Sequence, residues 1–166
     1  MQHTERSTLQ DIAFFVALFA TSLALGAALT HALELANKIG MIRDDYFVVQ
    51  RIYAGWNQLA YLLVIQLIGI VAVMWLHRSD TRVFWPAAVA LACLVAAQAM
   101  FWIWTFPANQ ATSNWTVKPA DWSRLRWQWE YSHLAGAALQ TMAMASLIIA
   151  VLRRGPLRST DPMADR

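Results

Sequence analysis

The stretch "YLLVIQLIGIVAVMWLHRSDTRVFWPAAVALACLVAAQAMFWIW", Tyr61 to Trp104, decides the fold. It consists of two apolar runs joined by the short polar segment "HRSDTR", residues 77–82. A helix needs about 20 predominantly apolar residues to cross a bilayer, and each run supplies that length. Because the connection is so short, the two helices must lie antiparallel and side by side. The stretch therefore predicts a transmembrane helical hairpin.

Two more apolar runs, one on each side of this hairpin, complete the pattern. The four predicted membrane helices span about residues 12–36, 52–76, 83–106 and 130–152. Pro107 is expected to end the third helix, since proline cannot continue a helix in the ordinary way. The first run is longer than the apolar core of a cleaved signal peptide, so we expect it to remain as a helix. We predict one all-α domain over residues 1–166, a transmembrane four-helix bundle with two longer loops on one side.

The composition agrees with a membrane protein. Hydrophobic residues make up 58% of the 166 residues and charged residues only 14%, whereas soluble domains carry about 25% charged residues. The nine tryptophans suit a chain with membrane–water interfaces. A net charge of +3, without a basic run interleaved with aromatics, gives no reason to expect a nucleic-acid partner. The expected partner is the lipid bilayer, and the sequence leaves the oligomeric state open.

The distribution of basic residues predicts the orientation. Four crossings place both termini on one side, which carries seven of the 13 Lys and Arg residues: Arg6, Arg78, Arg82, Arg153, Arg154, Arg158 and Arg166. The other side carries the remaining basic residues, Lys38, Arg43, Arg51, Lys118, Arg124 and Arg126. Because basic loops favour the cytoplasmic side, we expect cytoplasmic termini in an integral protein of a bacterial inner membrane.

Two mirrored motifs mark one end of the predicted bundle. "HALELANK", residues 31–38, places His31, Glu34 and Lys38 on one helix face. "WQWEYSH", residues 127–133, carries Glu130 and His133 at the same spacing in reverse order. Because the first and fourth helices are antiparallel, the two motifs are expected to meet at the same membrane depth.

Ionisable groups in a membrane segment require pairing, hydrogen bonds or a metal. Glu-x-x-His on facing helices is the ligand pattern of metal sites in helical bundles. We therefore predict a mononuclear site for a transition metal such as iron, copper, manganese or zinc. Its predicted ligands are His31, Glu34, Glu130 and His133, and the candidate catalytic groups are Glu34, Lys38 and Glu130.

Polar and aromatic residues at the same end are candidate contacts to a substrate. Tyr53 and Asn57 precede the second apolar run, and Asn109 follows the third. Trp115 and Trp122 lie in the second long loop, where their rings suit stacking on a planar substrate. The two long loops would then cover the site.

A structural interpretation of the same residues stays open. His31 and Glu34 suit the headgroup region, and the dipole at a helix N-terminus favours an acid such as Glu130. Glu34 and Lys38 also have the favourable spacing and order for an ion pair within one helix.

The segments "HALELANKIGMIRDDYFVVQRIYAGWN" and "FPANQATSNWTVKPADWSRLRWQWEYSH" resemble the small four-helix membrane proteins grouped with the anthrone oxygenases. The similarity covers about residues 18–151 and is densest in the two long loops. The resemblance implies the four-helix membrane fold. It also implies an oxygen-using activity, because some fungal members oxidise an anthrone to an anthraquinone, whereas many bacterial members have no established substrate.

Three classes of function follow from these patterns. The leading hypothesis is a membrane oxidoreductase, an oxygenase acting on a lipophilic or aromatic substrate, with the His/Glu site holding a metal. Without a metal, a partly desolvated His or Glu would act as general base on an acidic carbon, followed by attack of dioxygen. The alternatives are an electron-transfer protein that binds haem or a quinone, and a non-catalytic membrane subunit.

Overall fold

The computed structural model describes residues 8–154 of the chain, and these residues form helices and turns. The long helices are α1 (Thr8–Lys38), α3 (Leu59–Leu76), α4 (Thr81–Met100) and α6 (Trp122–Leu152). The shorter elements are α2 (Arg43–Val49), two 3₁₀ turns, η1 (Gln50–Tyr53) and η2 (Trp56–Gln58), a π-helical segment, η3 (Phe101–Thr105), and α5 (Phe106–Ala111).

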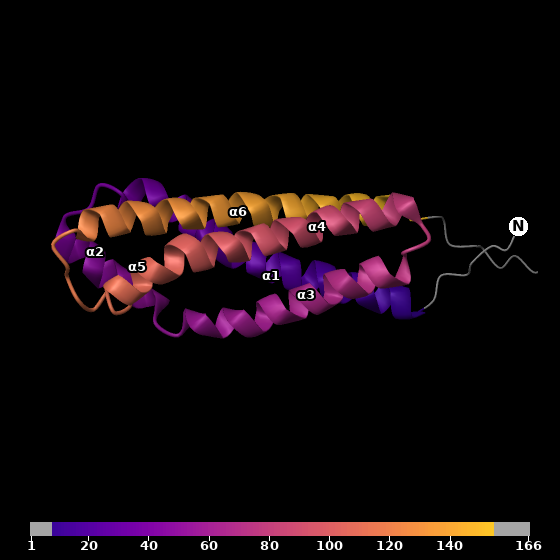
Figure 1. Cartoon of the computed structure of the whole chain (residues 1–166), viewed down its shortest axis with the longest axis horizontal. Helices are drawn as coiled ribbons and strands as arrows, with labels where there is room; N and C mark the ends of the chain where they lie inside the picture. The colour runs from indigo at the N-terminus through magenta and orange to yellow at the C-terminus, as the bar shows by residue number, and fades with distance from the viewer. Residues whose placement is uncertain (1–7, 155–166) are drawn as a thin grey trace, which may run out of the picture.

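The four long helices lie lengthwise beside one another, and α2 and α5 gather at one end (Figure 1). The α3–α4 hairpin and both ends of the described chain lie at the opposite end. α1 packs against α3 and α6, and α4 packs against α6. This arrangement confirms the predicted all-α bundle with its two longer connections on one side. We call the end that carries α2 and α5 the loop end.

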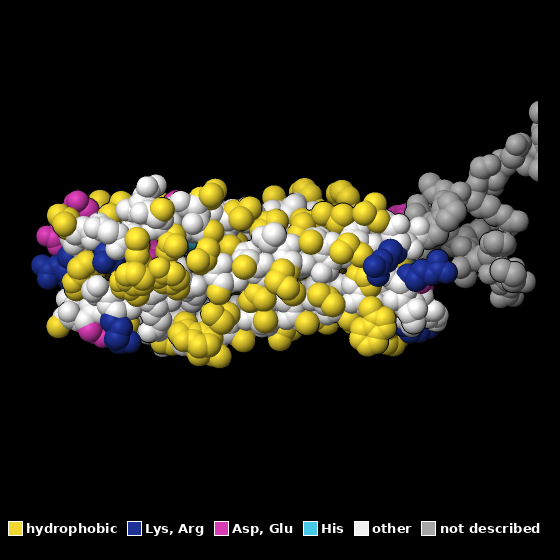
Figure 2. Space-filling model, turned by 90° about the horizontal axis from the view of Figure 1, so that it is seen from above, with side chains coloured by type: hydrophobic (Ala, Val, Ile, Leu, Met, Phe, Trp, Pro, Cys, Tyr) yellow, Lys and Arg dark blue, Asp and Glu magenta, His cyan; other side chains and the backbone are white. Residues whose placement is uncertain are grey.

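The bundle presents an apolar surface along its length. Four helical segments of the described chain are long and apolar enough to cross a membrane: residues 8–38, 56–76, 81–111 and 122–152. Large side chains such as Phe15, Ile68 and Trp102 are more than half exposed. Figure 2 shows hydrophobic side chains along the bundle and charged ones gathered at its two ends. A bilayer covers such a surface, so the chain is an integral membrane protein.

Small residues let the helices approach closely in the half of the bundle away from the loop end. A Cβ added to Gly69 of α3 would lie 2.7 Å from the backbone nitrogen of Ala17 and 2.8 Å from its Cα. Ala13, Ala87 and Ala90 are also buried in this core. Close backbone approach through small residues is the usual packing of helices in membranes, where no hydrophobic drive joins them.

Several helix boundaries differ from the sequence-based expectation. Pro107 does not end the third helix. The π-helical segment Phe101–Thr105 follows α4 directly, and α5 then continues past Pro107 to Ala111. Gln128 Nε2 of α6 donates to the Trp104 carbonyl at 2.7 Å, which satisfies an acceptor in the widened turn. α6 begins at Trp122 rather than near Glu130, so Glu130 lies inside the helix.

The second helix is interrupted at its start. α3 is regular only from Leu59, because Gly55 adopts a left-handed conformation with φ of 87° between the two 3₁₀ turns. This turn places the short segment Ala54–Gln58 beside α1.

The end opposite the loop end is closed by ordinary capping and ion pairing. The Asp80 side chain accepts a hydrogen bond from the Arg82 backbone nitrogen at 3.1 Å and caps α4. Arg154 pairs with Asp11 at 2.7 Å. Arg6, Arg158 and Arg166, which contributed to the predicted orientation, lie outside the described residues.

Candidate functional site

The two histidines of the mirrored motifs meet between α1 and α6. The rings of His31 and His133 stack with their centroids 4.1 Å apart and their planes 19° from parallel. The antiparallel order of the motifs produces this contact, as the sequence predicts. His31 is buried at 7% exposure, whereas His133 is partly exposed.

Aromatic side chains surround the histidine pair. Trp129, one turn before His133 on α6, contacts the rings of His31 and His133 with centroid distances of 5.1 and 4.1 Å. Tyr53 and Trp56 also contact His31, with ring centroids 4.6 and 5.1 Å away. The pair therefore lies in a box of rings contributed by α1, α6 and the two 3₁₀ turns.

Lys38 is the centre of a second, charged cluster at the end of α1. Its side chain is 2% exposed, and its Nζ lies 3.0 Å from Glu130 Oε1 and 3.8 Å from Glu34 Oε2. The ammonium also donates to Tyr53 Oη at 2.9 Å and lies 4.6 Å from the ring centroids of Tyr53 and Trp129. One buried cation thus faces two carboxylates and two aromatic rings.

Glu130 is the most deeply buried acid of the cluster, at 1% exposure. Its Oε1 accepts a hydrogen bond from Tyr46 Oη of α2 at 2.9 Å, in addition to the contact with Lys38. Gln50 Nε2 in turn donates to Tyr46 Oη at 2.5 Å. Burial, followed by the Glu130 charge, raises the pKa of Tyr46 above its usual value, so the phenol stays a neutral donor.

Glu34 connects the cluster to the surface. Its side chain is 31% exposed, and its Oε2 accepts a hydrogen bond from Tyr53 Oη. Burial and this hydrogen bond raise the pKa of Tyr53, which again keeps the phenol protonated. Tyr53 therefore accepts from Lys38, donates to Glu34 and packs on His31.

Asn109 fixes the orientation of the indoles at the loop end. Its Oδ1 accepts hydrogen bonds from Trp129 Nε1 at 2.9 Å and from Trp115 Nε1 at 3.2 Å. The π-helical segment that precedes α5 adds a further link, since Thr105 Oγ1 and Ser132 Oγ lie 2.7 Å apart next to His133. π-Helical turns occur often at functional sites, where they reposition side chains.

The structure separates the predicted substrate contacts into two groups. Tyr53 and Asn109 belong to the cluster or hold its rings in place. Trp115 is 4% exposed and packs on Tyr46 with ring centroids 5.2 Å apart, so it is part of the core at the loop end. Trp122 lies under Arg126, 4.6 Å from its guanidinium carbon, and Asn57 is an exposed residue of η2.

Sequence reasoning missed three residues of the site: Tyr46, Trp56 and Trp129. A signal existed for Trp129, because it precedes His133 by four residues and therefore shares its helix face. Tyr46 and Trp56 belong to the connection between α1 and α3, whose path does not follow from helical periodicity.

The four predicted metal ligands do not form a shared ligand group. Within residues 8–154, no three His, Cys, Asp or Glu side chains converge as a metal site. Glu130 and Glu34 face the Lys38 ammonium, which would repel a second cation. The lone pairs of His31 and His133 lie in their stacked ring planes and so cannot point at one ion, and the touching rings leave no space for a haem plane. The residues as arranged do not fit a metal or a haem.

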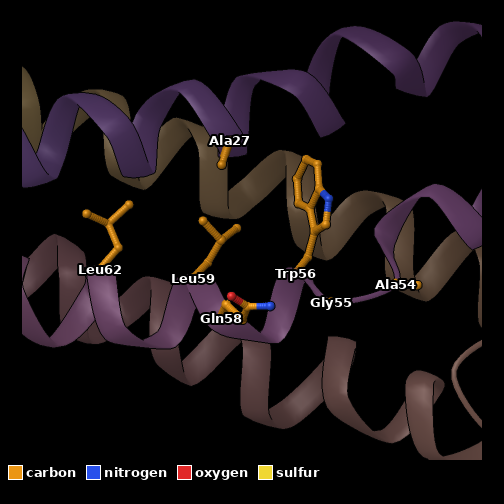
Figure 3. A pocket seen from close by; sticks show the side chains of 7 residues that line it. All are labelled: Ala27, Ala54, Gly55, Trp56, Gln58, Leu59 and Leu62. Atoms are coloured by element: carbon orange, nitrogen blue, oxygen red, sulfur yellow. The ribbon is translucent and has the colours of Figure 1, made fainter.

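A groove of about 410 Å³ opens beside the histidine pair, between α1 and the start of α3. Ala27, Leu59 and Leu62 line its apolar floor, and Trp56 and Gln58 border it. Figure 3 shows the Trp56 side chain reaching from the chain before α3 towards α1. The groove lies within the usual range of ligand sites, about 300–1,000 Å³.

Comparison of the chain with protein-family models, with curated proteins and with solved structures gave no match. The arrangement of the site itself is therefore the basis for a functional proposal.

Proposed function

We propose that this protein is a membrane oxidoreductase that oxidises a lipophilic, planar aromatic substrate with dioxygen, and that the His31–His133 pair is its general base. The stacked pair inside an aromatic box carries this proposal. Oxidation of an activated methylene is also the reaction that the sequence resemblance to the anthrone oxygenases suggests. We further propose that the site lies at the non-cytoplasmic face of a bacterial inner membrane, with the termini in the cytoplasm.

The histidine pair is suited to accept a proton from a weakly acidic C–H group. Two stacked imidazoles cannot both be protonated without strong like-charge repulsion, so at least one ring keeps a free lone pair. The surrounding rings of Trp56 and Trp129 exclude water, and a planar substrate can stack on them. The base and the binding surface are thus parts of one box.

The proposed reaction converts an activated CH₂ group and O₂ into a ketone and water. A histidine removes one proton, and the resulting carbanion forms a C–O bond with dioxygen, which gives a hydroperoxide after reprotonation. Loss of the second C–H proton and of hydroxide from the peroxide then yields C=O and H₂O. The carbon supplies four electrons, and both oxygen atoms are fully reduced in the products.

Lys38 and the two carboxylates have a positioning role in this proposal. Lys38 holds Tyr53 and Trp129 through hydrogen-bond and ring contacts, and both of these residues touch His31. Glu34 is partly exposed and accepts a hydrogen bond from Tyr53, so it gives a proton taken from the substrate a route to the surface.

Oxygen uptake by protein in lipid nanodiscs, with an anthrone as substrate, tests the proposal. We expect His133→Ala and His31→Ala to lose about 10²–10⁴-fold in rate, the usual contribution of a general base. His77→Ala is the matched control, because His77 is also buried but lies at the opposite end of the bundle, bonded to the Val73 carbonyl.

Two outcomes would contradict this assignment. Uptake no faster than in empty nanodiscs argues against an oxygenase acting on this substrate class. If a chelator abolishes the activity and one equivalent of a metal restores it, the reaction depends on a metal centre and not on a histidine base. Thermal melting of each variant separates a loss of chemistry from a loss of fold.

A further inference from the structure

We infer that the groove between α1 and α3 is the substrate site and its access route from the bilayer, and that Trp56 is the side chain separating it from the histidine pair. This inference rests on the proposed function. The ligand class is a planar, lipophilic molecule that carries a carbonyl or hydroxyl group.

The position of Trp56 joins the groove to the site. The same indole borders the groove and packs edge-on against His31 with ring centroids 5.1 Å apart. It also contacts Tyr53 at 5.0 Å, which in turn touches His31. A molecule in the groove is therefore one side chain away from the proposed base.

The lining of the groove indicates the chemistry of its ligand. Ala27, Leu59 and Leu62 give it an apolar floor, which suits an aromatic ring system arriving from lipid. Gln58 adds a side-chain amide at the border (Figure 3). Gln58 is exposed, and its amide can hydrogen-bond to a carbonyl or hydroxyl oxygen of a ligand that reaches this border.

The backbone next to Trp56 allows the indole to move. Gly55 has φ of 87°, a conformation that other residues rarely adopt, and it connects η1 to η2. A Cβ at Gly55 would meet only the Gln58 side chain, at 3.8 Å, so no tightly packed neighbour restrains this turn. Rotation about this turn would carry Trp56 away from His31 and join the groove to the aromatic box.

Binding of anthraquinone to protein in nanodiscs tests the inference apart from turnover, since this probe is planar, carries carbonyls and has no oxidisable methylene. In Leu59→Trp, the larger side chain fills the groove. We expect binding about tenfold weaker or more, with a raised KM for an anthrone and a kcat near the wild-type value. Ile68→Trp is the matched control, because Ile68 is an exposed, lipid-facing residue of the same helix.

The two proposals fail in different ways. If Leu59→Trp binds the probe as tightly as wild type, lipid rather than substrate occupies the groove, and the inference is overturned even where turnover persists. If wild type does not bind the probe at all, the inference also falls. If the probe binds and Leu59→Trp weakens it, while no anthrone is oxidised, the groove remains a ligand site and only the proposed function fails.

Discussion

Removing the charge of Lys38 should destabilise the protein more than removing the charge of its nearer acidic partner, Glu130. Lys38→Met leaves Glu130 buried with the Tyr46 hydroxyl as its hydrogen-bond donor, and no other cation of the described residues pairs with it. Breaking a buried ion pair in this way costs about 3–5 kcal/mol, because an uncompensated charge stays in a poorly solvated site.

Replacing Glu130 should cost less stability than replacing Lys38, because Lys38 has other partners. In Glu130→Gln, Lys38 keeps Glu34 at 3.8 Å and the Tyr53 hydroxyl at 2.9 Å. The remaining cost is that of a weakened buried hydrogen-bond network, about 1–3 kcal/mol. The double variant Lys38→Met/Glu130→Leu should recover most of the loss, since well-packed apolar residues replace buried pairs at little or no cost.

Unfolding in mixed detergent micelles, followed by the helical circular dichroism signal, measures these differences. Lys118→Met is the control, because its pair with Asp44 is exposed on both sides and should contribute little. The reasoning is refuted if Lys38→Met is as mild as Lys118→Met, or if the double variant is as unstable as the sum of the single ones.

Three further predictions concern packing, polar pairing and pH. Gly69→Ala should lower the free energy of unfolding by about 1–3 kcal/mol, because the new Cβ would collide with the α1 backbone. Gly26→Ala is the control, because nothing lies within 4 Å of a Cβ at that position, and it should not lower the free energy of unfolding. Equal effects of the two substitutions would argue against the close approach of α1 and α3. Gln66→Leu breaks a buried 2.9 Å hydrogen bond to Gln140 and should cost about 0.6–1.7 kcal/mol in the same unfolding assay, most of which Gln66→Leu/Gln140→Leu restores. The pKa of Tyr46 is raised in the folded protein, so the folded state is destabilised relative to the unfolded state once pH rises above about 10, where the phenol of the unfolded chain ionises. The melting temperature above pH ~10 should therefore fall less steeply with pH in Tyr46→Phe than in wild type. An unchanged slope would contradict the burial of this phenol.

The bundle and the meeting of the two motifs were predictable because they depend on local rules. Apolar length predicts each membrane crossing, and the reversed order of His31/Glu34 and Glu130/His133 predicts a contact between antiparallel helices. The continuation of the third helix past Pro107 was not predictable. It depends on a π-helical turn whose Trp104 carbonyl is satisfied by Gln128 of another helix, which is a tertiary contact.

The charged cluster shows a different limit of sequence reasoning. The spacing of Glu34 and Lys38 suits an ion pair within one helix, and in the structure this contact is 3.8 Å long. The shorter contact, 3.0 Å, is to Glu130 across the bundle. Two acids and two histidines at one depth suggest a metal if the lysine is left out, but a buried lysine supplies the positive charge that a metal would otherwise provide.

Buried polar atoms without a hydrogen-bond partner gather at the loop end of the described chain. Five buried side-chain atoms of the described residues lack a hydrogen-bond partner, and four of them lie at the loop end: His31 Nδ1, Gln50 Oε1, Arg126 Nε and Glu130 Oε2. The fifth is Thr21 Oγ1, in the middle of α1. Each such atom costs about 1–3 kcal/mol unless another molecule supplies the missing partner. The ordinary caps and ion pair at the opposite end show that this sequence can close a bundle without that cost. A buried water or a polar ligand at the loop end would supply these partners, because such atoms are usually satisfied by one or the other.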